Sequence, residues 1–156
     1  MDGVIADFDK RYRELYGERA SGEDRVQKNF SVNWDNFVAT RQFESLDWFP
    51  GGQDLVRYIQ QSDIPVEILS STGGPKYHVE VRRQKHFWLA SRFGIGLRGE
   101  NIVPGRRIKR FFSYPGNILI DDTEDVVEEF NQYGGKAILH RSAEETIKQL
   151  EDILNM

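Results

Sequence analysis

Polar residues that could do chemistry follow three short apolar runs. Asp121 and Asp122 come directly after the apolar run 117–120. Two adjacent carboxylates repel each other unless a cation or a proton lies between them, and oxygen ligands of this kind suit Mg²⁺. The simpler alternative is that one of the two caps a helix that begins at Thr123 or Glu124. The pair alone does not decide between these alternatives.

Hydroxyl residues followed by glycines, in the segment 70–74, end an earlier apolar run. Glycines let backbone N–H groups approach a ligand closely, and hydroxyl groups add donors, which suits a phosphate. An ordinary turn rich in small residues has the same composition. Position at the end of a strand favours the phosphate interpretation.

A basic run, Arg106, Arg107, Lys109 and Arg110, precedes the carboxylate pair. Such runs usually form a solvated face. A carboxylate that attacks a phosphate meets like-charge repulsion on the order of 4 kcal/mol per unit pair at ~4 Å and an effective dielectric of roughly 20. A metal ion and a lysine relieve this repulsion, so one member of the run is expected to face the carboxylates.

Strands that alternate with helices must position these residues. The apolar runs 64–69, 117–120 and 137–139 predict strands of a parallel α/β sheet, in which ligands bind outside the carboxyl ends. Helices are expected at 53–61, 79–93, 123–133 and 143–154, and a loop or short edge strand is expected at 94–105.

Residues from about 10 to 49 show scattered aromatics without a strand period, which predicts a small helical insertion. The expected organisation is one domain, with its core at about 1–9 and 50–156. Trp34, Phe43 and Trp48 are candidates for contact with a substrate ring. For each of them, a place in the insertion's own core is the simpler alternative.

The composition limits the class of protein. The chain has 156 residues, of which 38% are hydrophobic, enough for one sizeable core. A net charge of −4 gives no electrostatic reason to bind nucleic acid polymers or an anionic membrane. The absence of cysteine excludes disulfides, and the cytoplasm is the expected compartment. No apolar stretch approaches the roughly 20 residues that span a bilayer.

The opening segment makes the interpretation specific. Residues 1–9 read MDGVIADFD, which resembles the first motif of haloacid dehalogenase superfamily phosphatases, and especially that of 5′(3′)-deoxyribonucleotidases. SSTGGPKYHVEVRRQKHFW (70–88) resembles their second motif and ILIDDTEDVV (118–127) their fourth. The resemblance implies a three-layer, Rossmann-like (HAD-like) α/β fold with a mostly parallel sheet and a small helical cap.

The resemblance also implies roles by matching position. Asp2 would be the general acid that protonates the leaving alkoxide, and its backbone carbonyl would reach the metal. Ser71 would bind the phosphoryl group, and Lys109 would neutralise its charge. Asp121 would ligate Mg²⁺ directly, and Asp122 would act through water or by orienting the lysine.

The remaining implied residues contact the substrate: Phe8, which would stack on the nucleobase, with Thr72, Gly73, Phe43 and Lys76. Lys85 matches a family lysine whose role is left open, and Arg107 and Arg110 are alternatives to Lys109.

The activity implied is Mg²⁺-dependent hydrolysis of a (deoxy)nucleoside monophosphate through an aspartyl-phosphate. The partner is a small phosphate monoester, and a homodimer is left open. Two alternatives are a general small-molecule phosphatase and a catalytically inactive nucleotide-binding module.

In the family, the phosphorylated aspartate and the central strand come before the residue that matches Met1. A buried strand with about four large apolar side chains contributes roughly 1.5–3 kcal/mol for each, comparable with a net stability of ~5–15 kcal/mol. We therefore expect the natural chain to begin upstream of Met1. The less favoured alternative makes Asp7 the nucleophile, although Lys10 and Arg11 stand where a glycine and a branched residue should follow.

Overall fold

The computed structural model describes residues 1–17, 30–93 and 97–155 and has a mixed α/β architecture. The first part of the chain forms α1 (Phe8–Tyr16), α3 (Phe30–Ala39), the 3₁₀ helix η1 (Gln42–Ser45) and α4 (Gly52–Gln61). The middle forms β1 (Val66–Ser71), α5 (His78–Arg92), β2 (Leu97–Val103) and the 3₁₀ helix η2 (Arg106–Phe112). The last part forms β3 (Ile118–Asp121), α6 (Glu124–Gln132), β4 (Lys136–Leu139) and α7 (Ala143–Leu154).

The strands pair in parallel, as the alternation of apolar runs and helices predicts. β1 pairs with β2, with Ile68 opposite Glu100, and β3 pairs with β4, with Ile120 opposite Ile138. The segment 94–105 therefore contributes a strand and not a loop. Within the described ranges, however, the strands form two separate two-stranded sheets instead of one continuous sheet.

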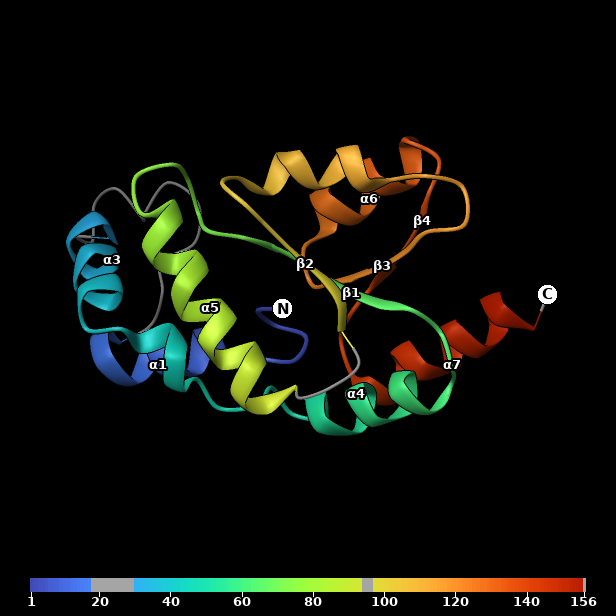
Figure 1. Ribbon diagram of the computed structural model, residues 1–156, viewed down its shortest axis with the longest axis horizontal. Coiled ribbons are helices and arrows are strands. Elements are labelled where there is room, and N and C mark those ends of the chain that lie inside the picture. The colour runs from blue at the N-terminus through green and yellow to red at the C-terminus, as the bar shows by residue number, and fades with distance from the viewer. Residues whose placement is uncertain (18–29, 94–96, 156) are drawn as a thin grey trace.

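Helices cover the strands on two sides (Figure 1). α6 lies on one side of the strands, α4 and α7 lie on the other, and α1, α3 and α5 gather at one end of the molecule. α1, α3 and η1 make up the helical insertion expected from the aromatic pattern, and we call them the cap. Part of that expectation, residues 18–29, lies outside the described residues. None of the helices described is long and apolar enough to cross a membrane.

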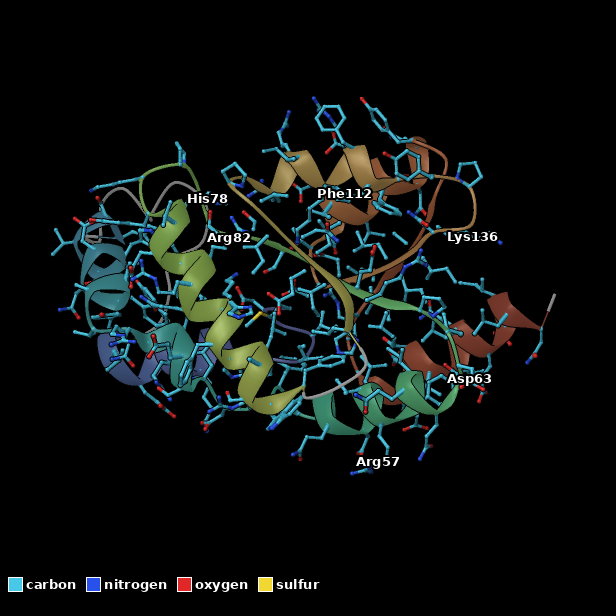
Figure 2. The ribbon with its side chains drawn as sticks, viewed as in Figure 1. Arg57, Asp63, His78, Arg82, Phe112 and Lys136 are labelled. Atoms are coloured by element: carbon cyan, nitrogen blue, oxygen red, sulfur yellow. The ribbon has the colours of Figure 1, made fainter. Side chains whose placement is uncertain are left out.

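Two hydrophobic clusters hold the layers together. The larger one joins the N-terminal segment, the cap and α5, and it includes the fully buried Ala6, Phe37 and Trp88. The smaller one lies under α6, where Phe130 packs near Leu119. Phe112, at the end of η2, lies between α6 and the strands and packs against this second cluster (Figure 2).

An apolar cavity of about 430 Å³ lies between β1 and β3. Ile68 and Leu69 line it from β1, Ile118 and Ile120 line it from β3, and Met1 contributes to its wall. Among the described strands, β1 pairs only with β2, and β3 pairs only with β4. The strand expected upstream of Met1 stays a prediction.

Candidate functional site

A second cavity, of about 610 Å³, lies where the ends of β1, β3 and β4 meet the N-terminal segment and the cap. Its polar end is lined by Asp2, Gly3, Ser70, Ser71, Lys109 and Asp122. Its aromatic end is lined by Phe8, Phe30, Trp34 and Phe43. The polar strand ends predicted from the sequence are thus brought together on one side of a single cavity.

A buried ion pair lies at the polar end, where Lys109 lines the cavity and Asp121 lies behind it, outside the lining. Lys109 Nζ donates to Asp121 Oδ2 at 2.7 Å, and the side chains are 11% and 7% exposed. Burial acts to raise the pKa of Asp121, but the charge and hydrogen bond of Lys109 outweigh it and hold this pKa below its usual value. Asp121 Oδ1 accepts from the backbone N–H of Thr123, so the carboxylate is fixed at both oxygens.

The 3₁₀ geometry of η2 places Lys109 on a different side from Arg107 and Arg110, its alternatives, and the role of Lys109 stays a prediction. Residues three apart lie above one another in a 3₁₀ helix, so Arg106 and Lys109 share one side, and both line the cavity. Arg107 and Arg110 share another side. There, Arg110 pairs with Glu129 of α6 at 2.9 Å.

Asp122 lies against the backbone of Gly3. A Cβ atom built on Gly3 would be 2.0 Å from Asp122 Oδ2, and Gly3 has a φ of +73°, so only glycine suits this position. Burial and then the neighbouring Asp121 raise the pKa of Asp122. Neither carboxylate is the N-cap residue of α6, because Thr123 occupies that position; the Thr123 side chain makes no capping bond, and Asp121 accepts from the Thr123 backbone N–H.

The acidic residues fit Mg²⁺ in chemistry. Asp122 has a raised pKa beside Asp121 and Asp2, and Asp2 Oδ1 is buried without a hydrogen-bond partner. Within the described residues, no three acidic or histidine side chains gather closely enough to hold an ion alone. Mg²⁺ does not require such a cluster, because it commonly takes one or two carboxylates, retains waters and uses substrate phosphate oxygens.

The loop after β1 places some of its predicted residues in the cavity and turns others away. Ser71 and Gly73 line the cavity, and Gly73 N–H donates to Ser71 Oγ at 3.1 Å. Thr72 is buried outside the lining, where its hydroxyl contacts His78 Nδ1 at 2.9 Å. Lys76 donates to Asp35 at 3.1 Å and also lies outside the lining. Thr72 and Lys76 therefore lie outside the lining, and their contact with a substrate stays a prediction.

At the aromatic end, Phe8 and Phe43 stack on each other with ring centroids 5.7 Å apart. Both are buried, so they form a wall behind the cavity more than a surface for stacking. Trp34 is only half-buried and keeps part of its indole at the lining. Trp48 instead packs against Trp88 of α5 at 5.0 Å, so it lies outside the lining and contacts the main core.

Asp7, the less favoured nucleophile, has a local structural role. Its carboxylate accepts from Lys10 N–H and caps the first turn of α1. Asp7 also lines the cavity, but the helix cap explains its position without catalysis.

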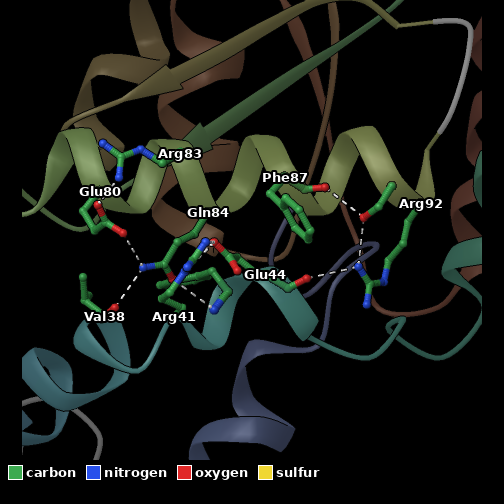
Figure 3. A network of polar contacts seen from close by, with 10 residues as sticks. Val38, Arg41, Glu44, Glu80, Arg83, Gln84, Phe87 and Arg92 are labelled. Atoms are coloured by element: carbon green, nitrogen blue, oxygen red, sulfur yellow. Dashed lines mark hydrogen bonds and ion pairs between the residues drawn. The ribbon is translucent and has the colours of Figure 1, made fainter.

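Helix α5 fastens the cap to the core (Figure 3). The fully buried Gln84 donates to the backbone carbonyl of Val38 at 2.8 Å and accepts from the backbone N–H of Phe43 at 3.3 Å. Trp88 Nε1 donates to the Leu46 carbonyl, and Arg92 donates to the Glu44 carbonyl. These bonds fix the backbone that carries Phe43, so the aromatic end is formed before any ligand binds.

Sequence reasoning left two residues after β4, His140 and Arg141, without a role. Both line the cavity, and Arg141 donates to the Asp122 carbonyl at 3.0 Å. His140 is buried, its Nδ1 contacts Thr146 Oγ1 at 2.7 Å, and its Nε2 has no partner. Burial, and to a lesser extent the positive charge of Arg141, lowers the pKa of His140. The sequence did hold a signal for these two residues, because they directly follow the strand predicted at 137–139, in the same position as the polar residues after the other two strands.

Comparison with known proteins adds little. No protein-family model matches the chain, and no curated protein matches it. Among solved structures, that of a hydrolase from Streptococcus pneumoniae TIGR4 aligns over 100% of this chain and 95% of its own, with 15% identity and a TM-score of 0.49. Similarity at this level carries no argument about fold or activity, so function has to be argued from the geometry of the site.

Proposed function

We propose that the protein is a Mg²⁺-dependent phosphatase of nucleoside monophosphates. The supporting observation is one cavity with a buried lysine and carboxylates at one end and an aromatic wall at the other. The two ends adjoin directly, because a Cβ atom on Gly73 would lie 3.1 Å from the Trp34 ring. A molecule that carries both a phosphate and a planar ring matches both ends.

The chain's own residues have distinct parts in this reaction. Lys109 supplies a fixed positive charge for the phosphate, and the Ser71 hydroxyl and nearby loop N–H groups donate to its oxygens. Asp2 gives a proton to the leaving oxygen and later takes one from water. Asp121 and Asp122 would hold Mg²⁺, which supplies charge neutralisation to the phosphate when bound.

A carboxylate nucleophile has to complete the mechanism. We place it on a residue bonded to the Met1 nitrogen, because Met1 is buried and lines the polar end of the cavity.

A nucleotide-binding module without turnover is the second candidate. Three acidic residues that line the cavity already have partners, which favours it: Asp2 pairs with Lys85, Asp7 caps α1 and Asp122 contacts Thr123. Such a module would bind nucleotide with Mg²⁺ and release no phosphate.

Phosphate release by the natively produced protein separates the candidates. We expect Mg²⁺-dependent release from deoxyribonucleoside and ribonucleoside monophosphates, and loss of release when Mg²⁺ is chelated. Nucleotide binding by calorimetry without any release would establish the binding module instead. Faster release from sugar phosphates than from nucleotides would contradict the proposed substrate class.

Replacement of Trp34 tests the aromatic end. Stacking of a base on an aromatic ring is worth about 1–3 kcal/mol, so Trp34→Ala should raise KM for nucleotides about 5- to 150-fold. KM for methyl phosphate, which has no ring, should change little. Tyr133→Ala, at an exposed aromatic residue after α6, is the control and should change neither constant.

A further inference from the structure

Lys85, in the middle of α5, is a charged residue that does not line the 610 Å³ cavity. Its side chain is only 1% exposed. Lysine is almost never buried this completely unless its charge is paired and hydrogen-bonded. The position of Lys85 therefore calls for specific partners.

Those partners belong to the polar end of the cavity. Lys85 Nζ donates to Asp2 Oδ2 at 2.9 Å, to Ser70 Oγ at 2.9 Å and to the Ser71 carbonyl at 2.7 Å. An ammonium group has three N–H bonds, so these three acceptors use all of its donors. One nitrogen thus joins the N-terminal segment to the end of β1.

The contact with Asp2 is asymmetric. Asp2 lines the cavity with a side chain that is 31% exposed, whereas its partner Lys85 is enclosed. Only Oδ2 is held, since Oδ1 has no hydrogen-bond partner. Lys85 also lies 5.1 Å from the centroid of the Phe43 ring, which closes the remaining side of the ammonium group. Nothing else bonded to Asp2 fixes the direction of its carboxylate in the described structure.

We infer that Lys85 is a positioning residue that fixes the Asp2 carboxylate relative to the phosphate-binding loop at Ser70 and Ser71. The inference rests on the proposed phosphatase function. Lys85 does not line the cavity, so it acts through Asp2. Its three bonds set the distance between the proton donor and the hydroxyl groups that hold the phosphate.

The step that depends on this distance is proton transfer to the leaving group. As the carboxylate nucleophile forms a bond to phosphorus, the bond from phosphorus to the ester oxygen breaks, and protonated Asp2 gives its proton to that oxygen. An alcohol leaves, and Asp2 is ionised. Water then attacks phosphorus, its proton passes to Asp2, and the bond to the nucleophile breaks, which restores both carboxyl groups.

Leaving-group dependence separates this role from simple packing. A nucleoside 5′-phosphate expels a poor leaving group that needs the proton, whereas p-nitrophenyl phosphate expels a good one that does not. Lys85→Met keeps the length and apolar stem of the side chain but removes all three bonds. We expect kcat to fall about 100-fold for the nucleotide and less than about 10-fold for the aryl ester, with KM little changed.

The double variant Asp2→Asn/Lys85→Met provides a second measurement. If Lys85 acts through Asp2, kcat of the double variant equals that of Asp2→Asn alone, because the group being positioned is already gone. The double variant also avoids a lone charge, so its thermal unfolding shows whether a loss of activity comes from misfolding. Lys148→Met, at an exposed lysine of α7, is the matched control and should behave as the unmodified protein.

Each outcome has a distinct meaning. Unequal losses for the two substrates, with no further loss in the double variant, support the positioning role. Equal losses for both substrates, or an additional loss in a folded double variant, overturn it while the phosphatase function stands. Absence of Mg²⁺-dependent release by the unmodified protein overturns the proposed function and the inference together.

Discussion

The two ends of the cavity are held in different ways. At the polar end, charged side chains from separate elements form single ion pairs. Lys109 pairs with Asp121, and Lys85 pairs with Asp2. At the aromatic end, many rings share the contacts, and Phe8 alone has four aromatic neighbours. Loss of one charged group leaves its partner uncompensated, whereas loss of one ring leaves the other rings in contact. A single substitution should therefore reduce stability and activity strongly at the polar end and only moderately at the aromatic end.

Asp121→Ala should have the largest effect. It leaves Lys109 buried without its partner, which should lower the free energy of unfolding by about 3–5 kcal/mol. Phosphate release should fall by roughly 100- to 1,000-fold because the polar end loses a fixed charge. Denaturant unfolding and initial rates measure both. Asp152→Ala, at an exposed position of α7, is the control and should change neither quantity. An Asp121→Ala protein that stays active would contradict the strong effect expected at the polar end.

Gly3→Ala should come next. The new Cβ would be 2.0 Å from Asp122 Oδ2, so Asp122 must move, and the positive φ adds about 1–3 kcal/mol of strain. Gly17→Ala is the matched control, because Gly17 also has a positive φ but nothing lies within 4 Å of its Cβ position. The difference between the two variants in unfolding free energy and in phosphate release isolates the contact with Asp122.

Gln84→Leu tests how the cap is held. It leaves the Val38 carbonyl and the Phe43 N–H without their buried partner, at a cost of about 1–3 kcal/mol in unfolding free energy. Phe43 should become less fixed, so KM for nucleotides should rise while kcat changes little. Gln61→Leu, on the exposed side of α4, is the control. A change in kcat as large as that in KM would show that the two ends are not independent.

His140 should have the smallest effect, seen in the pH dependence of stability. Its pKa lies below the usual 6.5 in the folded protein, so the unfolded chain binds a proton at a higher pH. Stability should therefore fall as the pH drops below about 6.5, by at most about 1.4 kcal/mol per pH unit. His140→Gln should weaken this slope in denaturant titrations between pH 7 and pH 5.

The sequence was sufficient for much of the fold. Short apolar runs with polar ends predicted β1, β3 and β4, because local composition and period determine where a strand begins and ends. The N-cap of α7 is equally local, since Ser142 accepts from the backbone N–H of Glu145, three residues later in the sequence. The pairing of strands into two sheets was not predictable, because it depends on contacts between distant segments.

The same division, between features set by local sequence and features set by contacts between distant segments, applies to the site residues. Lys109 could be separated from its neighbours only once η2 was seen to be a 3₁₀ helix, which places every third residue on one side. Thr72 lies between the lining residues Ser71 and Gly73 in the sequence, yet neither Thr72 nor Lys76 lines the cavity. Burial of Lys85 could not be anticipated either, because its three acceptors lie on segments far from α5.

The contact between Gly73 and Trp34 constrains the evolution of the molecule. A side chain at position 73 would meet the indole at 3.1 Å, and the φ of +81° already disfavours it. A lineage can therefore change residue 73 only after residue 34 has become smaller. Changes of substrate preference should therefore begin with substitutions in the cap, and substitutions in the loop after β1 should follow. In related sequences, a large residue at position 73 should not occur together with a large residue at position 34.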